Sequence, residues 1–316
     1  MRIDGQGKEY YFNGANELLI DLSGNIYLRD FWSSRQRAHL PVFSSDGRFI
    51  KDLYRQGEGP GEIASAYDFA LSESKIYILD YSKRKIVEMD NDGAFIQEFR
   101  LESDSVNELI GAFEEWLVVL RKVNPYERRT SRLYDVENVI VFVSKDGRKE
   151  KNCHIFLNQE FFISSAQGGG GMGWDPFIAA MGDGKLFVNS SQEYRIEVLD
   201  LKTERITARI KMKYRRVRHE MQDWERKFIS KFNAPKKRFE PDIEALFYDR
   251  DRIWVQTSRK EEDKGQLFDI FDTEGRFLDS FYIPIKGRIV KIDGEFLFSA
   301  EADKDLLPYV VKYRID

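Results

Sequence analysis

A short apolar strand that follows a tight turn recurs six times along this chain, and this repeat restricts the folds open to it. The strands begin at Ile26-Tyr27-Leu28, Ile76-Tyr77-Ile78, Trp116-Leu117-Val118, Leu186-Phe187-Val188, Ile253-Trp254-Val255 and Phe296-Leu297-Phe298. A second turn follows most of them, at Asp46-Gly47, Asp92-Gly93, Asp146-Gly147 and Glu274-Gly275, with Lys202-Thr203-Glu204 as a degenerate copy. Glycine accepts the positive φ of a tight strand reversal, so these pairs predict hairpins.

A four-stranded unit repeated six times predicts an all-β fold, the six-bladed β-propeller with four-stranded antiparallel blades. The blades are expected at residues 17–55, 67–101, 109–156, 177–212, 245–283 and from 288 onward. Because the repeats fill the chain of 316 residues, we predict one domain over residues 1–316.

Two segments fall outside the repeat. The last blade supplies only three strands before Asp316, so the strand-like run from Lys8 to Phe12 is expected to pair beside Tyr309–Tyr313 and close the blade. Apolar residues recur about every fourth position over residues 217–232, which predicts an amphipathic helix within an insertion at about 215–242.

Composition excludes little. The formal net charge of −4 is too small to indicate a nucleic-acid or membrane surface by itself. Cys153 is the only cysteine, so no internal disulfide can form. No apolar run approaches a membrane span, and residues 1–5 lack the apolar core of a signal peptide, so we expect neither in this chain.

The long connections of the predicted propeller are almost all b–c or d–a connections, which share one end of the blades. They are residues 56–65, 123–133, 158–175, 215–242, 258–266 and 301–306. Loops on a rigid scaffold are where binding and catalysis usually reside, so this end is the predicted functional face.

The most distinctive string runs from Arg55 to Ile63 and holds three glycines. Backbone N–H groups in such a loop can face an anion, with Arg55 beside them. It lacks the Gly-Lys-Ser/Thr ending of a P-loop. The alternative, which we favour, is a shaped connector between blades in which Glu58 or Glu62 bonds the backbone.

A glycine run at residues 168–173 precedes Trp174 and Asp175. A mobile loop here could close over a ligand, with the Trp174 ring stacking on a sugar or a cation. An insertion with Trp174 packed against blade four explains the sequence equally well.

Basic residues gather between Lys211 and Arg238, where eleven Lys/Arg face only Glu220, Asp223 and Glu225. An acidic polysaccharide, a phosphate group or an acidic protein would suit this charge, although a solvated helix face is the favoured explanation. Nucleic acid is not expected, because the rest of the chain is acidic. Further basic residues in the predicted b–c loops suggest an anion-attracting mouth: Arg35, Arg37, Arg84, Arg128, Arg129, Arg259 and Lys260.

Local catalytic and metal motifs are missing from the sequence. His39, His154 and His219 lie in different blades or connections, far from zinc-site spacing. No Gly-x-Ser-x-Gly elbow and no calcium loop occurs. Carboxylates from separate blades can still converge on the central channel of a propeller, which spacing does not reveal.

The repeats resemble the NHL-like six-bladed propellers of bacteria. The resemblance rests on residues 22–30 (LSGNIYLRD), 43–50 (FSSDGRFI), 56–62 (QGEGPGE), 241–242 (PD) and 251–255 (DRIWV), and it is poor in blade three and in the insertion. It implies a propeller that binds proteins, peptides or glycans and an extracytoplasmic location, periplasmic or at the cell surface. Related rings include calcium- or zinc-dependent lactonases and lyases, whose metal ligands have no match here.

We therefore expect a non-catalytic module that binds a protein, a peptide or an acidic or carbohydrate ligand, without a cofactor. The predicted ligand-binding residues are Arg35, Arg37, Arg55, Glu58, Arg84, Trp174, Asp175 and Arg259. The alternative is a propeller lyase or hydrolase with a divalent cation in the central channel. Three or more converging carboxylates would favour this enzyme, and an apolar or arginine-rich channel would favour binding.

Overall fold

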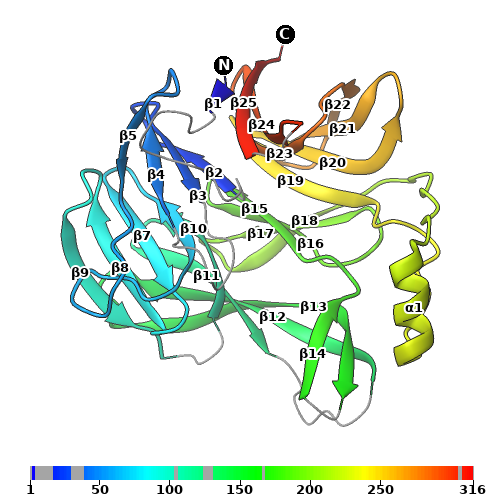
Figure 1. Cartoon of the computed structure of the whole chain (residues 1–316), viewed down its shortest axis with the longest axis horizontal. Helices are drawn as coiled ribbons and strands as arrows, with labels where there is room; N and C mark the ends of the chain where they lie inside the picture. The colour runs from blue at the N-terminus through cyan, green and yellow to red at the C-terminus, as the bar shows by residue number, and fades with distance from the viewer. Residues whose placement is uncertain are drawn as a thin grey trace. The chain divides into compact units, whose positions relative to one another are not determined.

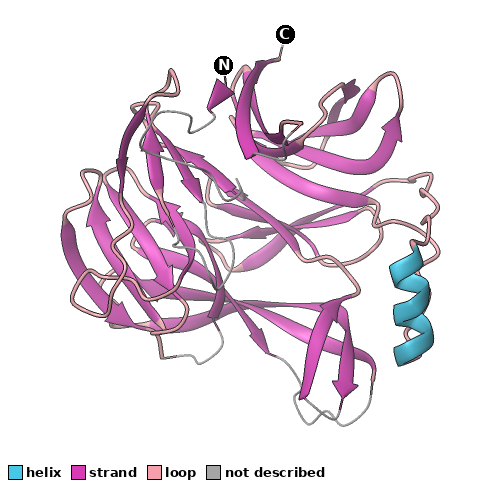
Figure 2. Cartoon of the chain, in the orientation of Figure 1, coloured by secondary structure: helices cyan, strands magenta, loops and turns pink. Residues whose placement is uncertain are grey.

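The computed structural model describes residues 2–3, 17–29, 39–102, 106–123, 131–165, 168–304 and 308–315. These residues form 25 strands and one helix (Figures 1 and 2). The strands assemble into six sheets whose neighbours follow one another in sequence, apart from the closing strand of the last sheet. The predicted six-bladed β-propeller is thereby confirmed.

Five blades have the predicted four antiparallel strands, and in four of these blades the strands follow one another along the chain. Blade one consists of β2 (Glu17–Ile20), β3 (Ile26–Arg29), β4 (Pro41–Phe43) and β5 (Phe49–Asp52). Blade two consists of β6 (Ala66–Leu71), β7 (Lys75–Asp80), β8 (Lys85–Asp90) and β9 (Phe95–Arg100). Blade four consists of β15 (Ile178–Gly182), β16 (Lys185–Asn189), β17 (Arg195–Asp200) and β18 (Arg205–Lys211). Blade five consists of β19 (Ile243–Asp249), β20 (Arg252–Glu261), β21 (Gly265–Asp272) and β22 (Phe277–Ile283).

Blade three has five strands rather than four. It is built from β10 (Val106–Phe113), β11 (Trp116–Val123), β12 (Arg132–Ser144), β13 (Glu150–Ser165) and β14 (Gly168–Gly173). The glycine run, predicted to lie in the long connection 158–175, is the strand β14, which pairs with β13 from Glu160↔Gly173 to Ser165↔Gly168. Strand pairing uses backbone groups alone, so the free edge of the long β13 can hold even a glycine segment.

The N-terminus closes the last blade, as predicted, but with a different segment. The order is β1 (Arg2–Ile3), β25 (Pro308–Arg314), β24 (Phe296–Ala302) and β23 (Arg288–Asp293). Arg2 lies opposite Val311 and Ile3 opposite Val310, the position expected for Lys8–Phe12. Residues 8–12 lie outside the described part of the chain.

The predicted tight turns adopt the left-handed backbone that the sequence indicated. In the turn from β8 to β9, Gly93 has a φ of +81°, and its N–H donates to the Asp90 carbonyl at 2.9 Å. In the degenerate turn of blade four, Glu204 stands where the other turns have glycine, and it has a φ of +57°. The turn geometry is therefore kept where the glycine is lost.

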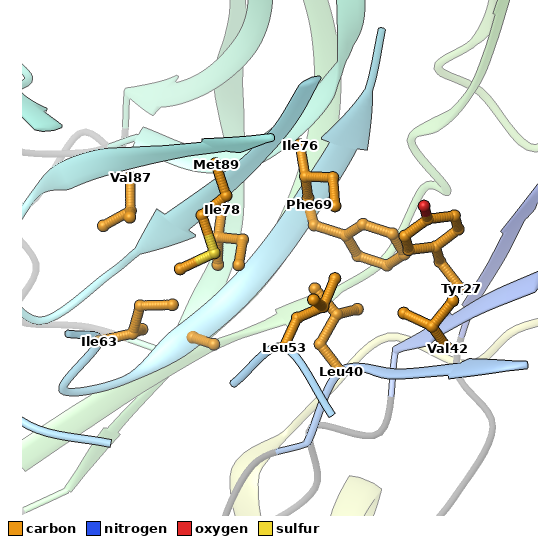
Figure 3. Packing of buried hydrophobic residues seen from close by; sticks show 11 residues of the cluster. Tyr27, Leu40, Val42, Leu53, Ile63, Phe69, Ile76, Ile78, Val87 and Met89 are labelled. Carbon is orange, nitrogen blue, oxygen red and sulfur yellow. The ribbon is translucent and has the colours of Figure 1, made fainter. Parts of the chain in front are cut away.

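Apolar side chains from neighbouring blades form the core. The cluster in Figure 3 joins blades one and two through buried residues of both, among them Tyr27, Val42, Phe69, Ile78 and Met89. A second cluster joins blades six and one, and a third joins blades four and five. Each blade alone leaves an apolar face uncovered, and stacking against the next blade removes that face from water.

The described residues divide into two compact units. Unit 1 comprises residues 1–121, 141–151 and 285–316, and unit 2 comprises residues 122–140 and 152–284. The prediction of a single domain stays a prediction.

The helix α1 (Asp223–Phe232) is shorter than the predicted 217–232. Residues before it pair across the base of the insertion instead: the N–H of His219 donates to the Arg238 carbonyl, and that of Glu240 to the Val217 carbonyl. Gln222 then caps the helix in a capping box with Glu225. Among the described residues, no helix combines the length and the apolar character needed to cross a bilayer.

Candidate functional site

Unit 1 places acidic side chains on the first strands of neighbouring blades. Glu17 lies on β2, Asp68 on β6 and Glu108 on β10. The strands β6 and β10 are in contact, as are β2 and β23, which carries Arg288. Together with Arg29, these residues are called the first-strand cluster (Glu17, Arg29, Asp68, Glu108 and Arg288).

Bulges in the first strands direct two of these acids. In blade two the pairing steps from Ala66↔Asp80 to Asp68↔Leu79, and in blade three from Val106↔Arg121 to Glu108↔Leu120. Each step leaves one extra residue on the first strand, immediately before the acid. Such a bulge changes which face of the strand the following side chain occupies.

Asp68 is the structural centre of the cluster. Its side chain is 2% exposed, and its Oδ1 lies 2.8 Å from Nη1 of Arg29. The backbone N–H of Phe69 donates to Oδ1 at 3.0 Å, and that of Leu109 donates to Oδ2 at 3.0 Å. Asp68 therefore ties blade one to blade three across blade two, and its two oxygens are occupied within the protein.

Glu17 shares the Arg29 guanidinium with Asp68. Its Oε2 lies 3.4 Å from Nη1 of Arg29, directly across the strand pair in which Glu17 is opposite Arg29. Burial, followed by the charge of Asp68, raises the pKa of Glu17 to about 8. When protonated, Glu17 donates a hydrogen bond to the Asp68 carboxylate. One proton is thus shared between two adjacent carboxyl groups, as neighbouring like charges require.

Glu108 and Arg288 are the exposed members of the cluster. Burial and then the charge of Asp68 raise the pKa of Glu108 to about 7, although the side chain itself is accessible to water. Burial and the charge of Arg29 lower the pKa of Arg288. Each side chain is therefore accessible and yet poorly solvated, since protein surrounds it at longer range.

Polar residues also end the second strands of the blades, but with a structural role. In unit 1, both carboxylate oxygens of the buried Asp80 accept backbone N–H groups, from Ala64 at 2.7 Å and Ser65 at 3.2 Å. In unit 2, the amide of Asn189 donates to the carbonyls of Glu193 and Arg195. These side chains fix connections between strands and are not available to a ligand.

The glycine loop after blade one is a connector, which was the favoured interpretation. Its N–H groups donate within the chain: Gly57 to the Ile63 carbonyl at 3.2 Å, Gly59 to Oε2 of Glu62 at 2.8 Å, and Gly61 to Oε2 of Glu98 at 3.2 Å. Arg55 donates to the Gly93 carbonyl at 3.4 Å. Glu58 pairs with Lys83 at 2.9 Å, next to Arg84 in the turn from β7 to β8. The structure thus brings Glu58 beside the Arg84 turn.

Trp174 and Asp175 lie in unit 2, directly after β14. Both backbone N–H groups donate to the Gln159 carbonyl, at 3.2 and 2.9 Å, and both side chains are partly buried. Lys237 Nζ lies 5.5 Å from the centre of the Trp174 ring. Burial raises the pKa of Asp175. The Trp174 ring therefore lies beside Lys237 of the insertion, and its packing against blade four stays a prediction.

The other predicted binding residues are not gathered around these groups. Arg35 and Arg37 lie outside the described residues. Arg259 lies on β20, because the predicted loop 258–266 continues as a strand pair with Lys260 opposite Gln266. In the residues that the structure describes, no three His, Cys, Asp or Glu side chains form a metal-binding group.

Sequence reasoning missed the first-strand cluster. The available signal was an acidic residue within an otherwise apolar or small-residue strand, as Asp68 is within Ala66–Leu71 and Glu108 within Val106–Phe113. A solvent-facing position explains such a residue equally well in sequence. The convergence depends on bulges and blade packing, which the sequence does not display.

Comparisons with known proteins agree with the fold. The family model DUF5128, described as a 6-bladed beta-propeller, matches residues 16–168. None of the curated proteins matches the chain significantly. A solved DUF4221 family member from Bacteroides vulgatus ATCC 8482 is 11% identical with a TM-score of 0.64, covering 97% of this chain and 94% of that chain.

A second solved structure is similar over the whole chain. It is a presumed exported protein from Bacteroides fragilis NCTC 9343, 12% identical with a TM-score of 0.58, and the match covers 100% of this chain and 94% of that chain. At these identities the likeness concerns the fold alone.

Proposed function

We propose that this propeller is a non-catalytic binding module whose first-strand cluster binds an acidic, carbohydrate-containing ligand. The observation that supports the proposal is that exposed polar side chains lie on strands held in place by a buried ion pair. Glu108 and Arg288 are exposed, while the buried Asp68 and its partner Arg29 hold the strands beneath them. A site of this kind costs little ordering on binding, because its support is already fixed.

The charges of the cluster suit an anion that also carries hydroxyl groups. The pKa of Glu108 is raised to about 7, so its exposed carboxyl group can donate a hydrogen bond when protonated, whereas the proton of Glu17 is engaged by Asp68. Arg288 offers a planar cation that matches a carboxylate, and an anion would relieve its repulsion with Arg29. Acidic sugars combine a carboxylate with hydroxyls, so they are the proposed ligand class.

Location belongs to the same proposal. The resemblance to often exported propellers, together with the fold shared with the Bacteroides fragilis protein, supports an extracytoplasmic site of action. The detection of this protein in the periplasmic or surface fraction of its own cells would test the location.

Calorimetric titration with an oligogalacturonate, with a neutral gluco-oligosaccharide as comparison, tests the binding function. We expect binding of the acidic oligosaccharide only, and a loss of about tenfold or more in affinity for Arg288→Ala, because charge-assisted hydrogen bonds contribute about 1.5–3 kcal/mol. Arg276→Ala, at an exposed turn, is the control and should bind normally. Equal affinities of the two arginine variants would refute the proposal.

The enzyme alternative has one specific observation in its favour. Glu17 and Asp68 share Arg29, and the charge of Asp68 raises the pKa of Glu108, so carboxyl groups from three blades influence one another in unit 1, although in the described residues they do not form a metal-binding group. Thermal unfolding in EDTA, and then with Ca²⁺, Zn²⁺, Mg²⁺ or Mn²⁺ added singly, separates the two functions. A metal at 100 times its dissociation constant adds about 2.7 kcal/mol of stability. A selective rise in Tm that Glu108→Gln abolishes would favour the enzyme.

A further inference from the structure

The inserted helix α1 protrudes with an incompletely covered apolar side. None of its ten residues is buried, although Trp224, Phe228, Ile229 and Phe232 are apolar. Trp224 is 61% exposed. An amphipathic helix of a soluble domain normally buries its apolar stripe in the core. Here Trp224 is exposed, and Phe228, Ile229 and Phe232 are only partly buried.

The helix is nevertheless held in a defined place. Phe228 packs edge-on against Phe161 of β13 with ring centres 6.4 Å apart, and against Phe232 at 5.0 Å. At the start of the helix, His219 bridges Glu240 at 2.8 Å and Glu225 at 3.0 Å. These contacts use the flank that faces the unit. Trp224 makes none of these contacts. The anchored helix holds its backbone in place, and its ring faces solvent.

Basic side chains border the exposed ring. Lys227 and Lys231 follow Trp224 at spacings of three and seven residues, which places the three on one stripe of the helix. Both lysines are exposed. The stripe thus combines an aromatic ring with two cations at the edge of the apolar side.

The flanking segments of the insertion extend the positive charge. Lys211, Lys213 and Arg215 alternate with inward residues along an extended segment, so their side chains share one side. The exposed cations of the insertion and of the segment that leads into it are Lys211, Lys213, Arg215, Arg218, Arg226, Lys227, Lys231, Lys236 and Arg238. Its exposed carboxylates are only Glu220 and Asp223, and Asp223 pairs with Arg226 at 3.6 Å.

We propose that this surface docks the protein on an anionic lipid membrane, with α1 lying in the interface. A helix that carries Trp and Phe on one side and Lys and Arg at its border is the arrangement of interfacial anchors. The exposed cations favour a partner with negative charge, and the exposed Trp224 ring favours a partner that also offers an apolar phase. A polysaccharide would use the Trp224 ring but would leave the partly exposed Ile229 in water. Nucleic acid would require several stacking rings.

Binding should depend on both components. Each Lys or Arg near an anionic bilayer contributes about 1 kcal/mol, which corresponds to about a fivefold change in affinity. Reversing Lys227 and Lys231 should therefore weaken binding by well over tenfold. The attraction should also fall steeply as salt is raised, since exposed charges are screened beyond the Debye length.

Co-sedimentation of the full chain with vesicles tests the proposal. Vesicles of phosphatidylcholine with phosphatidylglycerol should bind the protein, and pure phosphatidylcholine vesicles should not. Lys227→Glu with Lys231→Glu, and separately Trp224→Ser, should lose most of the binding while keeping the Tm of the parent. Lys202→Glu with Lys286→Glu, an exposed pair outside the insertion, is the matched control and should bind like the parent.

The outcomes are separable. Equal sedimentation with both vesicle types, or equal binding by the insertion double variant and its control, would overturn the proposal. So would an insertion that binds oligogalacturonate or single-stranded DNA but not anionic vesicles. Arg288→Ala should leave vesicle binding intact, so this proposal stands or fails apart from the ligand site in unit 1.

Discussion

Arg29 and Asp68 are 39 residues apart in sequence and meet with Nη1 2.8 Å from Oδ1. Arg29 ends the second strand of blade one, and Asp68 lies on the first strand of blade two. Because Asp68 also accepts the N–H of Leu109 in blade three, one ion pair links three consecutive blades. The partly buried Glu17 and the exposed Glu108 lie on the first strands of the outer two of these blades.

Replacing the buried carboxylate of Asp68 by a neutral side chain should destabilise the fold. We expect Asp68→Asn to lower the free energy of unfolding by about 1–3 kcal/mol, since Arg29 would lose its closest carboxylate and a buried group would be left unsatisfied. Urea unfolding measures the change. Asp92→Asn removes an exposed partner of Lys51, 95% accessible, and should stay within about 0.5 kcal/mol. Similar losses for both variants would contradict a central role for Asp68.

The raised pKa values of Glu17 and Glu108 predict that the free energy of unfolding decreases as the pH rises. Their pKa values are raised above the ordinary value of 4.5, to about 8 and about 7, so the folded state binds protons more tightly than the unfolded state. This contribution is complete below pH 4.5 and is lost as the pH rises through 7 to 8. Urea unfolding at pH 5, 7 and 9 should show a smaller decline in Glu17→Gln and Glu108→Gln than in the parent. A parallel decline in the variants would assign the effect to other groups.

The raised pKa of His219 predicts a second pH dependence, that of the local stability of the insertion. The hydrogen bond to Glu240, followed by the charges of Glu240 and Glu225, raises the pKa of His219 above 6.5. The protonated bridge is therefore fully present below pH 6.5 and is lost as the pH rises through the raised folded-state value. Amide hydrogen exchange of residues 217–240 should be faster at pH 9 than at pH 6 after correction for intrinsic rates. His219→Gln should remove that difference, and protection elsewhere in unit 2 is the internal control.

Alanine substitutions at Gly265 and Gly24 distinguish the cost of a strained backbone from the cost of a steric clash of the new Cβ. Both have a positive φ, +88° and +81°, so alanine at either position incurs a similar strain of about 1–2 kcal/mol. A Cβ at Gly265 would lie 2.1 Å from the Ile283 carbonyl oxygen, whereas at Gly24 it would lie 3.4 Å from Ser45 Cβ. We expect Gly265→Ala to be the more destabilising in thermal unfolding. Equal shifts in Tm would mean that the backbone around Ile283 adjusts freely.

Much of the fold is visible in the sequence because it is local. Each Asp-Gly turn and each apolar strand acts over a few residues, so the repeat and most blade limits are predictable. Closure of the last blade was predicted from its missing fourth strand, but the closing segment is Arg2–Ile3, which pairs with residues 310–311 at the other end of the chain. Errors arose where distant partners decide. The Gly168–Gly173 run is a strand only because β13 offers an edge, and residues 217–219 lie outside the helix because they pair with residues 238–240.

The candidate site follows the same division. The sequence by itself determined the number of blades, the turns between their strands and the charge of the insertion, since each depends on residue type and short spacing. Only the tertiary structure decided that Glu17, Asp68 and Glu108 interact, because bulges and blade packing bring together residues from three blades. The same packing commits the N–H groups of the glycine loop to this chain's own carbonyl and carboxylate oxygens. A hydrogen-bond donor has one proton to share, and which acceptor takes it depends on three-dimensional distance rather than on sequence.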